Sequence, residues 1–172
     1  MQLGIEDILG ESGLSKAVEV EFSAADVGVH ADDCEFGSPF LLKAEISNIG
    51  GIVRMKGRVS LKYGTFCARC LKPLTCGISA DIDEDFVKAD LGAILEGEDL
   101  YTYEGNSLAL DRAIGAAILL QVPIRHLCGD DCKSLCTACG KDLNQGDCGC
   151  GKVVSGGPFD ALAGFFGKEE PD

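Results

Sequence analysis

Histidine, long apolar runs and the common catalytic motifs are scarce in this chain of 172 residues. Only His30 and His126 are present, so a catalytic zinc site with histidine ligands and a neighbouring base is disfavoured. No stretch reaches the roughly eighteen apolar residues that a membrane-spanning helix needs, and we expect no membrane span. A glycine-rich phosphate loop, a Ser/His/Asp set and paired catalytic carboxylates are also missing, so the sequence predicts a protein that is not an enzyme.

The first thirteen residues lack a basic cluster, a long apolar run and a small-residue cleavage site. We therefore expect no secretory signal and a cytoplasmic location, where cysteines bind metal more often than they form disulfides. Hydrophobic residues make up 46% of the chain, enough for the core of one domain with a small metal module attached.

Acidic residues are absent from Ile46 to Ala80, although the net charge of the whole chain is −13. That stretch contains the cations Arg54, Lys56, Arg58, Lys62, Arg69 and Lys72. The following stretch, Asp81 to Asp111, contains ten acids and only one lysine, Lys88. The overall charge argues against a protein that coats nucleic acid indiscriminately, but the basic stretch leaves a local RNA contact open.

Cysteine is abundant, and its spacing is typical of structural zinc sites. Cys136-x-x-Cys139-Gly140 is a knuckle in which two sulfurs reach one ion and the glycine permits a tight turn. The eight closely spaced cysteines divide into two candidate four-sulfur sites, one with Cys136, Cys139, Cys148 and Cys150, the other with Cys67, Cys70, Cys128 and Cys132. Whether one or two structural zinc ions bind, and how the eight sulfurs pair, stays open.

Three other interpretations of these residues remain. Disulfides would have to join the clusters, since a bridge as short as Cys148-x-Cys150 is strained. A thiol redox role for Cys67-x-x-Cys70 is disfavoured, because the motif would need to begin a helix and a strand pattern follows it instead. His126 is a possible substitute ligand or, more simply, a packed residue, while Cys34 and Cys76 have no metal-ligand spacing.

Period-two alternation predicts strands at Val18–Ser23, Phe40–Ile49, 52–63 and 74–86, and period 3.6 predicts one helix at 107–121 capped by Asn106 or Ser107. The fold class is therefore α+β, with an antiparallel β-sheet core, one main helix and a C-terminal cysteine-rich zinc-binding module. We expect loops at 24–39 and at 87–106, the latter with a short strand near Tyr101. The predicted organisation is a core at 1–125, a zinc module at 126–152, and a linker with a short amphipathic helix at 153–172.

Within 52–63, alternation places the cations on one face of the strand and the apolar residues on the other. The cationic face, continued by Arg69 and Lys72, is the predicted RNA-contact surface, with Tyr63 or Phe66 as a stacking platform. The simpler interpretation is a solvated face whose cations balance the acids of 81–104.

The order of these motifs resembles the YceD-like family, the large ribosomal RNA subunit accumulation proteins. The resemblance rests on the C-x-R-C-L motif at 67–71, the segment ending Leu119-Leu120-Gln121-Val122-Pro123-Ile124, the cysteine motif at 128–150 and the Pro-Phe-x-x-Leu pattern at 158–162. Ser134 stands where the family usually has glycine.

The resemblance implies a non-catalytic factor that supports accumulation or processing of large-subunit ribosomal RNA or assembly of the large subunit. Its partner would be pre-ribosomal RNA, a ribosomal protein or a processing enzyme, with no membrane and no small-molecule substrate. The alternatives are a zinc-stabilised protein adaptor without RNA contact and a Cys-x-x-Cys redox protein.

Overall fold

The computed structural model describes residues 1–37, 39–92 and 100–150. The chain forms two compact units, Met1–Cys128 and a second that begins at Gly129. The predicted linker and amphipathic helix at 153–172 lie outside the described residues, as do residues 93–99 of the predicted acidic loop. No helix in the described ranges is both long enough and apolar enough to cross a membrane.

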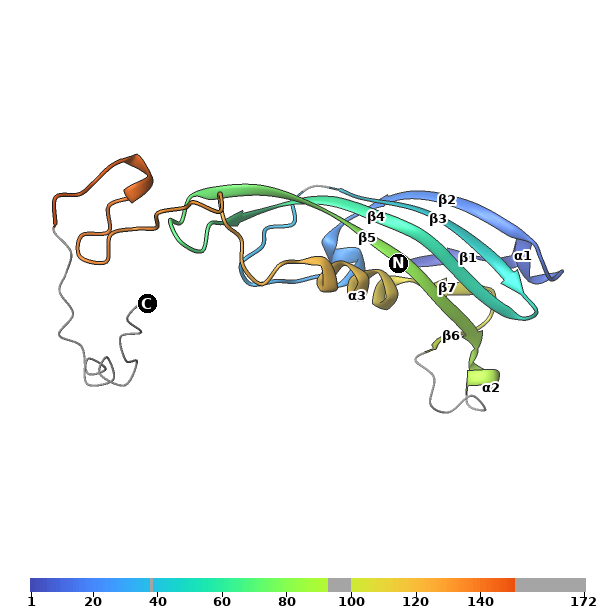
Figure 1. The fold of residues 1–172 in the computed structure, drawn as a ribbon. Coiled ribbons are helices and arrows are strands. Elements are labelled where there is room, and N and C mark those ends of the chain that lie inside the picture. The colour runs from blue at the N-terminus through green and yellow to red at the C-terminus, as the bar shows by residue number, and fades with distance from the viewer. Residues whose placement is uncertain (38, 93–99, 151–172) are drawn as a thin grey trace, which may run out of the picture. The chain divides into compact units, whose positions relative to one another are not determined.

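A five-stranded sheet organises the first unit, in the order β2-β3-β4-β5-β6 (Figure 1). Its strands are β2 (Ser15–Phe22), β3 (Phe40–Ile49), β4 (Ile52–Phe66), β5 (Pro73–Lys88) and β6 (Tyr101–Tyr103). The pairs from β2 to β5 are antiparallel, as predicted, whereas β5 and β6 pair in parallel. A parallel pair needs a long connection, and residues 89–100, which begin with helix α2 (Ala89–Gly92), separate these two strands in the sequence.

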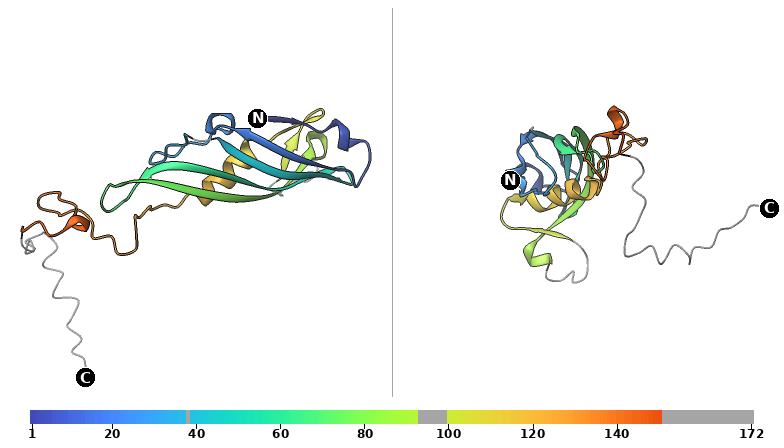
Figure 2. Two further views of the ribbon diagram at one scale, coloured as in Figure 1. Left: turned by 90° about the horizontal axis from the view of Figure 1, so that it is seen from above. Right: turned by 90° about the vertical axis from the view of Figure 1, so that its left-hand side faces the viewer.

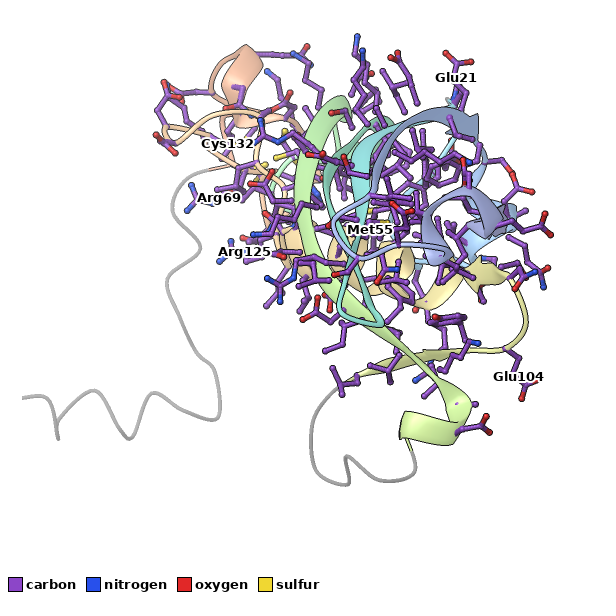
Figure 3. The ribbon with its side chains drawn as sticks, turned by 90° about the vertical axis from the view of Figure 1, so that its right-hand side faces the viewer. Glu21, Met55, Arg69, Glu104, Arg125 and Cys132 are labelled. Atoms are coloured by element: carbon purple, nitrogen blue, oxygen red, sulfur yellow. The ribbon has the colours of Figure 1, made fainter. Side chains whose placement is uncertain are left out.

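The long hairpin of β4 and β5 is the element that positions the first cysteine pair. Along β4 the predicted alternation is confirmed: Val53, Met55, Val59, Leu61 and Tyr63 are buried. Figure 3 shows Met55 among the packed side chains and Glu21 directed outward from the neighbouring part of the sheet. Gly57 has the same parity as the buried set and is partly buried, and a β-carbon there would lie 2.5 Å from the Ala44 Cβ and from the Lys43 carbonyl oxygen. The sheet thus has one apolar face and one charged face.

The prediction of a helix over 107–121 is correct only for its second part. Residues Ser107–Ala109 form strand β7, which pairs with β1 (Gln2–Gly4), and α3 spans Asp111–Gln121. Leu108 and Leu110 are both fully buried, and that spacing of two suits a strand as well as a helix. The predicted caps are wrong: the N-cap is Leu110, and the Asn106 carbonyl accepts a hydrogen bond from Ile5 N.

Helix α3 covers the concave side of the sheet (Figures 1 and 2). Ala113, Ile114 and Ile118 are fully buried in the core, together with the inward residues of β3 and β4. Two short helices complete the unit, α1 (Glu6–Leu9) and the 3₁₀ helix η1 (Ala24–Val27), the second of which lies within the predicted loop. η1 forms there because the Asp26 carboxylate accepts hydrogen bonds from the Ser23 N–H and hydroxyl, both at 2.7 Å.

Candidate metal centres

The turn Cys67–Lys72 joins β4 to β5 and forms the first knuckle. Cys67 N donates to the Lys72 carbonyl at 2.8 Å, and Leu71 N donates to the Cys67 carbonyl at 2.9 Å. Leu71 has a φ of 58°, a left-handed conformation that glycine adopts more easily. The turn buries both sulfur-bearing residues, Cys67 and Cys70, and presents their sulfurs together.

The second unit contains a knuckle with the same backbone bonds. Cys136 N donates to the Lys141 carbonyl at 2.8 Å, and Gly140 N donates to the Cys136 carbonyl at 2.8 Å. Gly140 has a φ of 73°, in agreement with the turn predicted for it. Cys-x-x-Cys followed by one left-handed residue and a lysine is therefore a local structure that this chain builds twice.

Three predicted ligands converge in the first unit. The sulfurs of Cys67, Cys70 and Cys128 all lie within 4.8 Å of one another, and Cys70 Sγ is 3.6 Å from Cys128 Sγ. Two hydrogen bonds hold the segment of Cys128 against the knuckle: Ala68 N donates to the His126 carbonyl at 2.8 Å, and Cys128 N to Cys67 Sγ at 3.4 Å. Cys132 follows in the second unit and stays the predicted fourth ligand.

All four ligands predicted for the other site are brought together. The sulfurs of Cys136, Cys139, Cys148 and Cys150 lie within 4.8 Å of one another, and Cys148 Sγ is 3.4 Å from Cys136 Sγ. Tetrahedral zinc with Zn–S bonds of about 2.3 Å places its sulfurs about 3.8 Å apart. The observed separations therefore fit one zinc ion after a small adjustment.

The acidity of the thiols supports metal binding. Backbone N–H groups, chiefly those of Cys70 and Cys139, lower the pKa of Cys67 and of Cys136 to about 6, so both sulfurs favour the thiolate form at neutral pH. Cys150 is the opposite case, since hydrogen bonding and charge from Cys139 and Cys148 raise its pKa to about 12. Cys150 thus resists ionisation beside its neighbours, and a divalent cation is the species that would relieve the repulsion among four thiolates at this site.

Asn144 is a supporting residue that the analysis of ligand spacing missed. It lies in the 3₁₀ helix η2 (Leu143–Gln145), where the Asp142 carboxylate accepts a hydrogen bond from its backbone N at 2.9 Å. Its side-chain amide donates to Cys132 Sγ at 3.6 Å, and its amide oxygen accepts from Lys133 N at 2.8 Å. The available signal was Leu143-Asn144, which lies within the cysteine motif at 128–150 that carries the family resemblance. Next to this network Ser134 has a φ of 65°, which explains why glycine suits the position.

The geometry bears on the disulfide and redox interpretations of the cysteines. All ten cysteines are free thiols, so the structure contains none of the disulfides considered. Cys70 is followed by β5 and not by a helix, which leaves a redox Cys67-x-x-Cys70 without its helix terminus. Cys34 and Cys76 are half-buried against the core and belong to neither four-sulfur group.

His126 has a packing role in this structure. Its Nε2 lies 2.8 Å from the Tyr63 hydroxyl, and the two rings meet edge to face. Burial raises the pKa of Tyr63 to about 12, so the phenol stays protonated. Because only 2% of Tyr63 is exposed, the prediction that it stacks on a base is wrong, whereas Phe66 is 56% exposed and remains available.

The cationic face of β4 is paired with acids on β5. Arg54 donates two hydrogen bonds of 2.6 Å to the carboxylate of Asp85, its cross-strand partner. Lys56 and Asp83 form an ion pair of 3.0 Å, and Arg58 and Asp81 one of 2.6 Å. The solvated, charge-balanced interpretation therefore describes these three cations. Beyond this ladder of ion pairs, Lys62 lies on β4 opposite Gly77. Arg69 and Lys72 lie within the turn of the hairpin.

The Asp85→Asn substitution should lower the stability of the protein at pH 7 and have a progressively smaller effect below pH 4. The Arg54 guanidinium hydrogen-bonds to Asp85 and lowers the pKa of this carboxyl. A lowered pKa gives stability that is present above the unfolded value of about 3.9 and is lost as the pH falls through the folded value. Urea unfolding of both proteins at pH 7, 5, 4 and 3 measures the difference. Asp83→Asn, which breaks the more exposed pair, is the control and should change stability less; equal effects would contradict the assignment.

The family of the chain follows from comparison with known proteins. A family model described as "Large ribosomal RNA subunit accumulation protein YceD" matches residues 55–166, which include β4 from Met55 onward, all of β5 and all eight candidate ligands. The chain belongs to the YceD family. This confirms the resemblance drawn from the cysteine motifs. No solved structure matches the chain significantly.

Similar proteins from several organisms accompany the YceD family match. An uncharacterized protein of Mycobacterium leprae is 24% identical over 85% of this chain and 64% of its own length. An uncharacterized protein of Mycobacterium tuberculosis is 25% identical over 70% of this chain and 59% of its own length. A Zea mays protein named large ribosomal RNA subunit accumulation protein YCED homolog 1, chloroplastic, is 24% identical over 83% of this chain and 58% of its own length. The chain thus spans about three fifths of the curated relatives it matches.

Proposed function

We propose that this YceD-family chain is a non-catalytic cytoplasmic factor that supports the accumulation of large-subunit ribosomal RNA by binding that RNA. The family description and the name of the maize relative supply the process. The observation that carries a non-catalytic role is the closed set of four sulfurs at Cys136, Cys139, Cys148 and Cys150. A zinc ion held by four thiolates has no open position for a substrate or an activated water.

Two structural zinc ions complete the proposal. One is held by Cys136, Cys139, Cys148 and Cys150, and the other by Cys67, Cys70, Cys128 and Cys132. Bound zinc supplies rigidity, because metal affinity for the folded site adds to the free energy of folding. The protein would use its metal to fix loops that contact a partner.

Loss of the site formed by Cys136, Cys139, Cys148 and Cys150 should reduce the level of large-subunit ribosomal RNA in cells. In cells that lack the chromosomal gene, we expect the ratio of large- to small-subunit ribosomal RNA to fall at least twofold and the wild-type gene to restore it. A gene encoding Cys136→Ser and Cys139→Ser should fail to restore it, because both knuckle sulfurs are lost. The ratio is measured by electrophoresis of total RNA, with the protein level checked by immunoblot.

The matched control carries Cys34→Ser and Cys76→Ser, which remove two thiols outside the metal groups, and it should restore the ratio fully. An unchanged ratio in cells without the gene would refute the proposed function.

The alternative is a zinc-stabilised adaptor that binds a ribosomal or processing protein without touching RNA. The net charge of −13 and the ion pairs of Arg54, Lys56 and Arg58 favour it. Salt dependence separates the two, because each phosphate contact with single-stranded RNA contributes about −0.7 to the slope of log affinity against log salt. An affinity for a purified protein partner that exceeds any affinity for RNA and has a shallow slope would favour the adaptor.

A further inference from the structure

The end of the β4–β5 hairpin is the part of the first unit where exposed cations lie outside the ladder of ion pairs. We use the name hairpin-end surface for Phe66, Arg69, Lys72 and Arg125. All four side chains are exposed, and Phe66 is 56% accessible to solvent. Two segments far apart in the sequence, the turn 67–72 and the stretch 125–128, contribute to it.

Backbone contacts bring these two segments together. Ala68 N donates to the His126 carbonyl at 2.8 Å, and Arg69 and Arg125 are the chain neighbours of that bonded pair. Cys128 N also donates to Cys67 Sγ at 3.4 Å. Figure 3 shows Arg69 and Arg125 directed outward on the same side of the unit. The two arginines therefore belong to one surface, although 55 positions separate them in the sequence.

The charge of the hairpin-end surface differs from that of the sheet face. Neither contributing segment contains an acid: Asp and Glu are absent from 46–80 and from 112–129. Within the described residues, Lys72 and Arg125 form no ion pair, whereas Lys56 and Arg58 each hold an aspartate. Asp33 and Glu35 lie on the loop that contacts Gly64 and Thr65, before the turn. Asp130 and Asp131 follow the stretch 125–129 in the sequence. Lys72 and Arg125 can therefore bind phosphate without first breaking an ion pair within the described residues.

Phe66 adds a feature that suits single-stranded nucleic acid. Its ring is exposed at the last position of β4, next to the buried Cys67 and opposite Pro73 in the sheet register. An aromatic ring fixed on a strand beside cations is the usual arrangement for stacking an unpaired base while the phosphates are held. Leu71, 63% exposed in the same turn, widens the apolar contact.

We propose that the hairpin-end surface binds single-stranded RNA, with Arg69, Lys72 and Arg125 on phosphates and Phe66 stacked on a base. The inference deepens the proposed function and rests on it for the class of partner. It moves the RNA contact away from the predicted cations Arg54, Lys56 and Arg58. The rival explanation is that these cations balance the charge of about −2 that a zinc ion with four thiolates carries.

The test measures the binding of a fluorescein-labelled 20-nucleotide oligouridylate to the zinc-loaded full chain by fluorescence anisotropy, from 50 to 300 mM KCl. One variant carries Arg69→Gln, Lys72→Gln and Arg125→Gln. The matched control carries Lys43→Gln, Lys56→Gln and Arg58→Gln, which remove the same charge from cations that are paired with acids. Zinc content and melting temperature are measured for both.

We expect the hairpin-end variant to bind at least tenfold more weakly at 100 mM KCl, with a salt slope shallower by about two, because three phosphate contacts are lost. The control should change affinity less than twofold. A separate Phe66→Ala variant should weaken binding about tenfold, at an unchanged salt slope. All three variants should keep the zinc content of the wild type.

Four results would overturn the inference. Equal losses in the two triple variants would mean that only overall charge matters. Loss of zinc from the hairpin-end variant would show that its cations serve the metal. Unchanged RNA affinity in that variant would place the contact elsewhere and leave the proposed function standing, because the ribosomal RNA ratio in cells tests that function separately. A wild-type chain that binds no RNA at 50 mM KCl would remove both the surface and the RNA partner.

Discussion

A Cys67→Ser variant should bind one zinc ion where the wild-type chain binds two, and a Cys139→Ser variant should lose the other. Each substitution removes one of four sulfurs, and three remaining thiolates hold structural zinc far more weakly. Cys67 directly follows β4 and is fully buried, so its loss should also destabilise the first unit. Native and denaturing mass spectrometry count the ions, and thermal unfolding measures the cost.

The control for this experiment is Cys34→Ser, a half-buried cysteine outside both groups, which should keep two zinc ions. One zinc in the wild-type protein, lost only in Cys139→Ser, would contradict the two-site arrangement. Cys67 and Cys70 would then be free thiols, and a redox assay such as insulin reduction would be the next experiment.

A Gly57→Ala substitution should destabilise the first unit by about 3 kcal/mol, at the upper end of the usual cost of overpacking. A β-carbon at Gly57 would lie 2.5 Å from the Lys43 carbonyl oxygen and 2.6 Å from Ala44 Cα, and both are backbone atoms that cannot rotate away. Strands β3 and β4 would have to separate locally. Urea unfolding monitored by circular dichroism measures the loss, and we expect the melting temperature to fall by about 10 °C.

Gly77→Ala on β5 is the matched control, because a β-carbon there would meet only the Leu61 carbonyl oxygen, at 3.8 Å. Its effect should stay within about 0.5 kcal/mol. A double variant with Ala44→Gly and Gly57→Ala should recover only part of the stability, since the clash with the Lys43 oxygen remains. Equal effects of the two single substitutions would mean that β3 and β4 can separate at little cost.

The strands could be predicted because each has one buried face. Phe40–Ile49 is reproduced with the same bounds, and β4 follows the alternation read from 52–63 although it continues to Phe66. The start of α3 could not be predicted, because Leu108 and Leu110 fit both periods and the pairing of β7 with distant Gln2–Gly4 decides between them. Local patterns carry no information on such a long-range partner.

The metal site and the cationic face also differ in how far local sequence patterns predict them. Cysteine spacing is a local signal, and all four sulfurs of the group from Cys136 to Cys150 lie together as expected. Whether Arg54 meets an acid depends on the register of β4 and β5, in which Asp85 is its cross-strand partner. A shift of one residue would have moved the side chains of the shifted strand to the opposite face of the sheet. Arg125 was missed as a candidate contact residue because only the fold brings it beside the Cys67 turn.

The contact between Cys70 and Cys128 has a consequence for chain entropy. A metal that binds both residues closes a loop of 58 residues, which includes β5, β6, β7 and α3. The cross-link relation for unfolded chains gives about 4 kcal/mol for a loop of that size and about 3 kcal/mol for the 12-residue separation of Cys136 and Cys148. An ion bound by Cys70 and Cys128 thus restricts the unfolded ensemble of nearly half the unit that contains the sheet. An ion bound by Cys136 and Cys148 restricts only its own short loop.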